Sequence, residues 1–201
     1  MGKMKEFRSP MTEIIHSFLE SVKEAESRLS RLLEGRCEIA VHHELAEDLV
    51  EAIEAIDHEK FRQELWYGRD EWNSRRKRKG FLCITASLEG RVIAFDYGYD
   101  DEEEGAFYSD NTATLIEGKG VGTTLFVLEI IHSYEHGYRY TKLSTEEVDD
   151  KGRPLQRIWG RLGFETVSAD PSKGVEMRLT HTLQGIRSIY DRYVSDRQPS
   201  S

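Results

Sequence analysis

Three closely spaced glycines between an apolar stretch and an amphipathic stretch constrain the fold of this chain more than any other feature. They stand at positions 118, 120 and 122 of the segment LIEGKGVGTTLF, residues 115–126. Glycines allow positive φ and a close approach of the backbone to a ligand. A helix that starts directly after them presents unpaired amides and the positive end of its dipole. The segment predicts either a plain bend or a strand–loop–helix unit that holds a phosphate.

Two widespread phosphate-binding motifs do not fit this spacing. A P-loop needs Gly-Lys-Ser/Thr four residues after its first glycine, and no such triplet follows here. A GxGxxG loop that starts at Gly118 needs a third glycine at position 123, where Thr123 stands. The hydroxyls of Thr123 and Thr124 add hydrogen-bond donors at the expected helix start. An anion at this loop would therefore be held mainly by backbone amides.

The chain around the loop alternates between helical and strand patterns. We expect a long first helix capped at Ser9-Pro10 and ended by Gly35, and further helical stretches at 44–56, 59–80, 123–137, 153–163 and from about Thr182. Strands are expected at 37–43, 81–88, 92–99, 106–116, 139–145, 164–170 and 175–181, with tight turns at 89–91, 100–105 and 171–174. This order predicts a layered α/β protein of the α+β type with a mixed sheet.

The first helix carries an apolar stripe at spacings of three and four residues over 11–33. Such a stripe packs either on the core of its own domain or on a second copy of the chain. Only about three heptads are present, which favours packing on the chain's own core and leaves a homodimer as the alternative.

Composition limits the classes of function. The chain of 201 residues has 28 basic and 37 acidic side chains, a net charge of −9 that argues against a general nucleic-acid binder and favours cationic partners such as amines. No apolar run approaches the roughly 18 residues of a membrane span. The charged N-terminus has no apolar core behind it, and the two cysteines, Cys37 and Cys83, have no CxxC spacing. These features predict a cytoplasmic protein with no membrane partner.

Two separated motifs give the chain a resemblance to the GNAT acyltransferase superfamily over roughly residues 36–181. EGKGVG at 117–122 is similar to the [QR]-x-x-G-x-[GA] pyrophosphate loop of that family, and WGRLGF at 159–164 resembles its Y-x-x-x-G-F segment. The resemblance implies a GNAT fold with an N-terminal helical extension. It divides the chain into the extension (1–35), an acetyltransferase domain (36–181) and a C-terminal helix with a polar tail (182–201).

The resemblance also implies an acetyl-CoA site and an amine acceptor. The strand before the loop would pair with the pantetheine arm, and the loop amides would cradle the pyrophosphate in an opening between this strand and the strand at 139–145. The residues implied in cofactor binding are Thr112, Ala113, Thr114, Gly118, Lys119, Gly120, Val121, Gly122, Thr123, Thr124 and Trp159. No metal is implied.

Three positions depart from the family pattern. Glu117 replaces the usual Gln or Arg, Trp159 replaces a tyrosine proposed to protonate the leaving thiolate, and Gly152 stands where an asparagine is frequent. An indole N–H donates a hydrogen bond but delivers no proton at neutral pH. Two functions follow: an N-acetyltransferase acting on a primary amine, or a GNAT-shaped module that binds acyl-CoA or a protein partner without turnover.

An amine acceptor requires a base, because an ammonium with a pKa near 10.4 is neutral only about once in 2,500 molecules at pH 7. The candidates near the expected opening are Asp110, Glu146 and Tyr108, the last through a water molecule. Each of these could instead be an ordinary solvated or turn residue.

Three further patterns each allow two interpretations. HSYEH at 132–136 matches a zinc-protease motif, but it closes a helix and lacks a clear third ligand. RRKRK at 75–79 suits nucleic acid or, more simply, a solvated helix end. The aromatic residues among Leu65, Trp66, Tyr67 and Trp72 suit an acceptor pocket or core packing.

Overall fold

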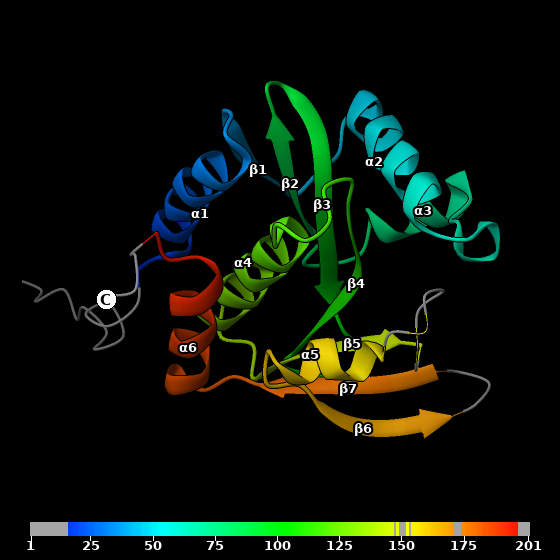
Figure 1. Ribbon diagram of the computed structural model, residues 1–201. Coiled ribbons are helices and arrows are strands. Elements are labelled where there is room, and N and C mark those ends of the chain that lie inside the picture. The colour runs from blue at the N-terminus through cyan, green and yellow to red at the C-terminus, as the bar shows by residue number, and fades with distance from the viewer. Residues whose placement is uncertain (1–15, 147, 149–151, 153, 171–173, 197–201) are drawn as a thin grey trace, which may run out of the picture.

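The computed structural model describes residues 16–146, 148, 152, 154–170 and 174–196. Figure 1 labels the helices and strands, whose bounds are α1 (Phe18–Leu33), β1 (Cys37–His42), α2 (Glu47–Lys60), the short 3₁₀ turn η2 (Gln63–Leu65), α3 (Arg69–Arg75), β2 (Leu82–Leu88), β3 (Arg91–Asp100), β4 (Ala106–Thr114), α4 (Val121–Glu135), β5 (Tyr140–Thr145), α5 (Leu155–Gly160), β6 (Glu165–Asp170), β7 (Gly174–Thr180) and α6 (Leu183–Tyr193). Each predicted strand is present. The predicted turn at 171–174 lies largely outside the described residues.

The strands form one mixed sheet in the order β1-β2-β3-β4-β5-β7-β6. Neighbouring strands are antiparallel except β4 and β5, which are parallel. The prediction of an α/β protein with a mixed sheet is therefore confirmed. In Figure 1, β5, β7 and β6 cross the lower part of the molecule in a different direction from β2, β3 and β4.

Two apolar cores lie on opposite faces of the sheet. Residues of α1, α4 and α6 form one core with the inner side chains of β1, β2 and β7, and residues of α2 and α3 form the other with β2 and β3. Figure 1 shows α4 between α1 and α6 on one side, with α2 and α3 on the other. The alternation of side chains along β2 feeds both cores, since Leu82 and Ile84 face α4 while Cys83 faces α2.

The first described helix differs from its prediction at both ends. The expected start at Ser9 lies outside the described residues, and α1 begins at Phe18, where Ser17 and Glu20 form a capping box. It ends at Leu33, and the left-handed residue that closes it is Glu34 (φ 55°), one position before the predicted stop at Gly35. The apolar stripe packs on α4 within the same chain, as predicted. The division at 35 and 181 stays a prediction, as does a homodimer.

The stretch 59–80 is not one helix, contrary to prediction. α2 ends at Lys60, Phe61 is extended, and a new helix starts only at Arg69. Gly68 is extended (ψ 160°), and its N–H donates to the Glu71 carboxylate at 2.9 Å, which fixes the start of α3. The break places residues 61–68 as a loop over the end of β4. This loop becomes one wall of the site.

Candidate functional site

β4 and β5 separate after a short paired segment. Their register covers only Ala106↔Tyr140 to Tyr108↔Lys142, so the outer edge of β4 beyond Tyr108 faces an opening. The N–H of Leu115 donates to the Ile93 carbonyl of β3 at 2.8 Å. Because backbone groups alternate sides along a strand, the amides of Thr112 and Thr114 point away from β3 and into this opening. The two strands therefore offer a free backbone edge to a ligand.

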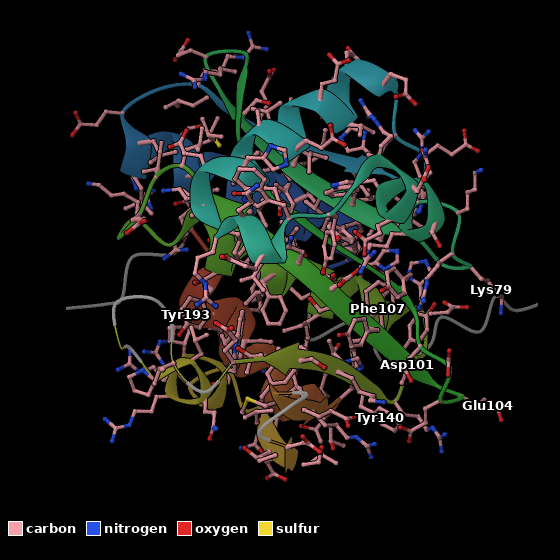
Figure 2. All side chains as sticks on the ribbon, turned by 90° about the vertical axis from the view of Figure 1, so that its right-hand side faces the viewer. Lys79, Asp101, Glu104, Phe107, Tyr140 and Tyr193 are labelled. Carbon is pink, nitrogen blue, oxygen red and sulfur yellow. The ribbon has the colours of Figure 1, made fainter. Side chains whose placement is uncertain are left out.

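A groove of about 1570 Å³ occupies the opening. It is bounded by β4, the glycine loop, the start of α4, the end of β5, α5 and the loop after α2, and residues from all of these line it. Tyr193 at the end of α6 also lines the groove, and Figure 2 labels it on the side of the molecule away from Asp101. Residues of both motif regions, 117–122 and 159–164, line this one groove.

The glycine loop and the start of α4 form one end of the groove. Gly118 and Gly120 both have φ of 76°, a left-handed conformation that favours glycine. Gly120 is the N-cap of α4, and the first backbone bond of the helix runs from the Thr124 N–H to the Gly120 carbonyl at 2.9 Å. The amides of residues 121–123 therefore project from the helix end. Amides in this position are able to bind an anion, and anion binding at this loop stays a prediction.

Gly122 serves a different purpose. A Cβ atom at this position would lie 3.5 Å from Thr114 Cγ2 and 3.8 Å from Thr112 Oγ1. The first turn of α4 thus runs directly beside the free edge of β4. A side chain larger than alanine at position 122 would enter the space between α4 and the free edge of β4.

Most of the predicted cofactor-binding residues line this groove. They are Thr112, Ala113, Thr114, Gly118, Gly120, Val121, Gly122, Thr123 and Trp159. Lys119 and Thr124 do not line it. The Thr124 side chain is fully buried and donates to the Tyr193 carbonyl at 3.1 Å, so its hydroxyl faces α6 and not the groove. The backbone of Thr124 is likewise occupied by the helix.

The Glu117 carboxylate has a cationic partner that the sequence did not identify. Lys60 Nζ, from the end of α2, lies 3.3 Å from Glu117 Oε1. Lys119, the lysine nearest to Glu117 along the chain, does not line the groove. Lys60 does line the groove, so its positive charge lies beside the glycine loop. The acidic departure from the family motif is therefore compensated by α2.

Asp110 lies in the groove wall and is held by three donors. Its side chain is 5% exposed, and it accepts hydrogen bonds from Arg75 Nε at 2.8 Å, Tyr99 Oη at 2.8 Å and Tyr67 Oη at 3.3 Å. Burial and the neighbouring carboxylate raise the pKa of both tyrosine hydroxyls, which keeps them as donors. The carboxylate of Asp110 ties β4 to α3.

The other two predicted base candidates lie in different surroundings. Glu146 lines the groove at its mouth, is exposed and pairs with Arg62 at 2.7 Å. Tyr108 does not line the groove. It borders a separate hollow of about 450 Å³ with Asp101 and Lys142, near the end of the molecule where Figure 2 labels Asp101. The structure thus brings Asp110 and Glu146 to one cavity and leaves Tyr108 outside it.

The aromatic residues divide between the groove and the core. Trp66 and Tyr67 line the groove, and the Arg75 guanidinium lies 3.7 Å from the Tyr67 ring centroid. Trp72 is fully buried among the aromatic side chains of β3, so of its two interpretations, acceptor pocket and core packing, the structure supports core packing. Trp159 lines the groove and packs on Phe126, with ring centroids 4.8 Å apart. Its indole N–H is buried and has no acceptor among the residues that the structure describes.

The basic cluster at 75–79 is largely paired inside the molecule. The partners are Asp110 for Arg75, Glu47 for Arg76, the Tyr99 ring for Arg78 and Asp100 for Lys79. Four of the five side chains therefore have a partner within the chain, and Arg75 joins α3 to β4.

The two histidines of HSYEH pack as aromatic rings. His132 and His136 stack with centroids 3.9 Å apart, and burial lowers the pKa of His132 to about 4. In the part of the chain that the structure describes, no group of three His, Cys, Asp or Glu side chains has the arrangement of a metal site. Across the same residues, no helix is long and apolar enough to cross a membrane.

Sequence reasoning missed several groove residues because they come from elements distant in the chain. Lys60 ends α2 and Phe61 follows it, Arg192 and Tyr193 end α6, and Ser109 precedes the bulge of β4. Asn111 donates to the buried Asp57 of α2 at 2.8 Å, which fixes α2 over the groove. None of them carried a sequence signal of its own, since even Ser109 stands in a run of polar residues that continues through Asp110, Asn111 and Thr112.

The splayed strands, the glycine loop and the helix order define the class of fold. This protein has the GNAT N-acyltransferase fold, with a further helix before its first strand. The sequence matches no family model and no curated protein. The likeness therefore rests on solved structures, and because their sequence identity to this chain is low, they show its fold and not its activity.

Three solved structures illustrate the likeness. The ribosomal-protein-S18-alanine N-acetyltransferase from Escherichia coli is 14% identical with a TM-score of 0.56, covering 71% of this chain and 93% of its own. An acyl-CoA N-acyltransferase from Pseudomonas aeruginosa is 19% identical with a TM-score of 0.58, covering 71% and 98%. The PaiA N-acetyltransferase from Thermoplasma acidophilum, solved in complex with coenzyme A, is 13% identical with a TM-score of 0.57, covering 72% and 99%.

Proposed function

We propose that this protein is an acetyl-CoA-dependent N-acetyltransferase that transfers an acetyl group to a primary amine. The observation that carries the proposal is the junction of two features in one groove: the free edge of β4 and the amides at the start of α4. A strand edge suits an extended arm with amide groups, and a helix N-terminus suits a phosphate. Acetyl-CoA carries both of these chemical groups.

In this proposal each part of the substrate has a counterpart in the groove. The pantetheine arm would pair with the outward amides and carbonyls of Thr112 and Thr114, and the pyrophosphate would sit at the amides of residues 121–123, beside Lys60. A backbone amide of β4 would polarise the thioester carbonyl as negative charge develops on it. The amine attacks the carbonyl carbon, and the coenzyme thiolate leaves.

The acceptor end of the groove is acidic and aromatic. Glu64, Glu71 and Glu146 line it together with Trp66 and Tyr67, whereas Lys60 lies at the glycine loop. This distribution suits a cationic amine, which both carboxylates and aromatic faces attract. It does not select between a small molecule and a protein amine. A cytoplasmic location remains the prediction from the sequence.

Turnover tests this function directly. The purified chain would be incubated with acetyl-CoA and a panel of amines: spermidine, kanamycin, a peptide with a free N-terminal alanine and an N-terminally blocked peptide with one lysine. Release of the free coenzyme thiol above the rate without amine supports the proposal. Binding of acetyl-CoA with no thiol release on the whole panel contradicts it.

That second outcome would favour a GNAT-shaped module without turnover. Its support in the structure is specific: Trp159 offers a buried indole N–H and no transferable proton, and Glu117 brings a carboxylate to the groove. Such a module would still bind acyl-CoA through backbone amides and would present the bound complex to a protein partner.

A further inference from the structure

Two carboxyl groups lie buried together behind the wall of the groove. Asp96 on β3 and Glu129 on α4 are both fully buried, and each acts directly on the other. Among the residues that the structure describes, neither has a salt-bridge partner, and none of their four carboxyl oxygens has a partner with full hydrogen-bonding geometry. Buried carboxylates without a counter-charge are costly, so the pair has a strong tendency to hold protons.

The surroundings of the pair raise the pKa values of both carboxyl groups. Burial raises the pKa of Asp96 to about 8, and burial and Asp96 raise the pKa of Glu129 well above its ordinary value. The Thr112 and Ser109 hydroxyls act in the opposite direction. Two further titratable groups act on the pair through their charge from the opposite face of the sheet: Cys83 on β2, whose pKa burial also raises, and Asp110 on β4.

Ser109 connects the pair to the groove. It belongs to β4, its residue is 5% exposed, it lines the groove, and its hydroxyl lies against the Glu129 carboxyl. The register shows why it faces this way: Ser109 pairs with Gly98 and Asn111 with Tyr97, so Asp110 is an extra residue in β4. This bulge turns Asp110 and Asn111 towards α2 and α3 and leaves Ser109 facing α4.

Gly98 provides the room that the pair requires. A Cβ atom at this position would lie 2.7 Å from Glu129 Oε2, so the carboxyl group occupies space that a side chain on β3 would fill. A glycine on the paired strand, a serine on the groove wall and an acid on the core helix thus form one continuous contact.

We propose that Asp96 and Glu129 hold the proton that leaves the acceptor amine, and that the Ser109 hydroxyl relays it from the groove. The inference rests on the proposed function. The alternatives in the groove are engaged already, since Asp110 is bonded to Arg75 and Glu146 to Arg62. Ser109 is the residue that contacts the acceptor in this account, and Asp96 and Glu129 act through it.

The step is balanced as a proton transfer followed by acyl transfer. An N–H bond of the ammonium breaks and its proton moves to the Ser109 oxygen, while the Ser109 proton moves to the singly ionised pair. The free amine attacks the thioester carbon, the C–N bond forms and the C–S bond breaks. A second proton of the nitrogen leaves with the thiolate as free thiol. The pair then returns its proton to solvent.

Kinetics of three variants test the relay with spermidine and the blocked lysine peptide as acceptors. Ser109→Ala should lower kcat at pH 7 by about a hundredfold with little change in the KM for acetyl-CoA, and Ser109→Thr, which keeps the hydroxyl, should restore it. In the wild type, kcat should rise through an inflection near pH 8 that is the same for both acceptors, whose amines titrate about two units higher. Glu129→Gln should remove this inflection.

Infrared difference spectra give a readout that does not depend on turnover. The wild type should show a protonated carboxyl band at pH 6.5 that disappears as the pH is raised past 8, and Asp96→Asn should abolish that change. If the wild type turns over and Ser109→Ala has the same kcat, or if no titrating carboxyl band is seen, the relay is overturned and the acetyltransferase proposal stands. Acetyl-CoA binding without turnover on any amine overturns both.

Discussion

At the scale of single residues, the groove depends on charges that other elements neutralise. Asp110 would be an uncompensated buried carboxylate without α3, because Arg75 supplies its cation and Tyr99 a further donor. Glu117 would repel a pyrophosphate without α2, because its partner is Lys60. The sequence alone presents Asp110 as a catalytic candidate and Glu117 as a departure from the family motif. In the structure each is neutralised by a residue distant in the chain.

Removal of the Arg75 cation should destabilise the fold. Arg75→Met leaves Asp110 buried with two neutral donors, and the loss of one partner of a buried pair costs about 3 kcal/mol. Urea denaturation would measure this loss. Arg69→Met is the control, because Arg69 pairs with the exposed Glu47 at 3.4 Å, and such surface pairs contribute less than about 1 kcal/mol. Equal losses for the two variants would contradict the account of Asp110.

Neutralising Lys60 should weaken the binding of acetyl-CoA, and neutralising Glu117 should strengthen it. Lys60→Met exposes the bound phosphate to Glu117 and should weaken acetyl-CoA binding about tenfold, a screened fraction of the Coulomb energy at this distance. Glu117→Gln should strengthen it by a few fold, and the double variant should bind nearly as the wild type does. Calorimetry would measure all three affinities. A Lys60→Met variant with unchanged affinity would show that the pyrophosphate lies elsewhere.

At the scale of elements, the site is made by one strand that pairs on one side only. β4 bonds to β3 along its length, but β5 leaves it after Tyr108. The glycine loop then brings α4 back beside the free edge, with Gly122 close to Thr114. The bulge at Asp110 assigns neighbouring side chains to opposite faces of the sheet. The chemistry of the groove follows from these three backbone features.

Gly98 should be the least replaceable residue in this arrangement. A Cβ atom there would lie 2.4 Å from the Tyr108 carbonyl oxygen and 2.5 Å from a Phe107 ring carbon. Gly98→Ala should therefore destabilise the protein by about 3 kcal/mol or more, as overpacking in a rigid core does. Gly160→Ala is the matched control, since nothing lies within 4 Å of its Cβ position. Thermal unfolding that gave the two variants the same midpoint would contradict the packing at the bulge.

The elements themselves were largely predictable from sequence, and their partners were not. The strand patterns and the glycine loop gave the mixed sheet and the start of α4 within two residues. The break between α2 and α3 was missed because charged and aromatic residues mask an extended segment at 61–68. The bulge, the pairing of Lys60 with Glu117 and the burial of Glu129 depend on tertiary contacts. Periodicity along one element carries no information about them.

At the scale of the whole molecule, the acid pair makes stability depend on pH in an unusual direction. The folded state raises the pKa of Asp96 from an ordinary value of 3.8 to about 8, so the folded state binds a proton that the unfolded state has lost. This contribution to stability is complete below pH 4 and declines as the pH rises to 8, with a slope of up to about 1.4 kcal/mol per pH unit.

Asp96→Asn should remove this slope. The amide stays neutral at every pH, so the variant should become more stable relative to the wild type as the pH rises from 5 to 8. Urea denaturation of both proteins at several pH values would measure the difference, which cancels the contributions of surface carboxylates. A difference that does not change with pH would contradict a protonated Asp96 in the folded state.

The account as a whole depends on acetyl-CoA binding at the start of α4, and calorimetric titration tests this most directly. The wild type should bind acetyl-CoA with a Kd of micromolar order, about 8 kcal/mol. Gly122→Ala, whose methyl group would make an ordinary contact with Thr114 at 3.5 Å, should still bind. Gly122→Glu places a bulky anion between α4 and β4 and should abolish binding. No binding by the wild type, or equal binding by Gly122→Glu, would contradict the assignment of the groove.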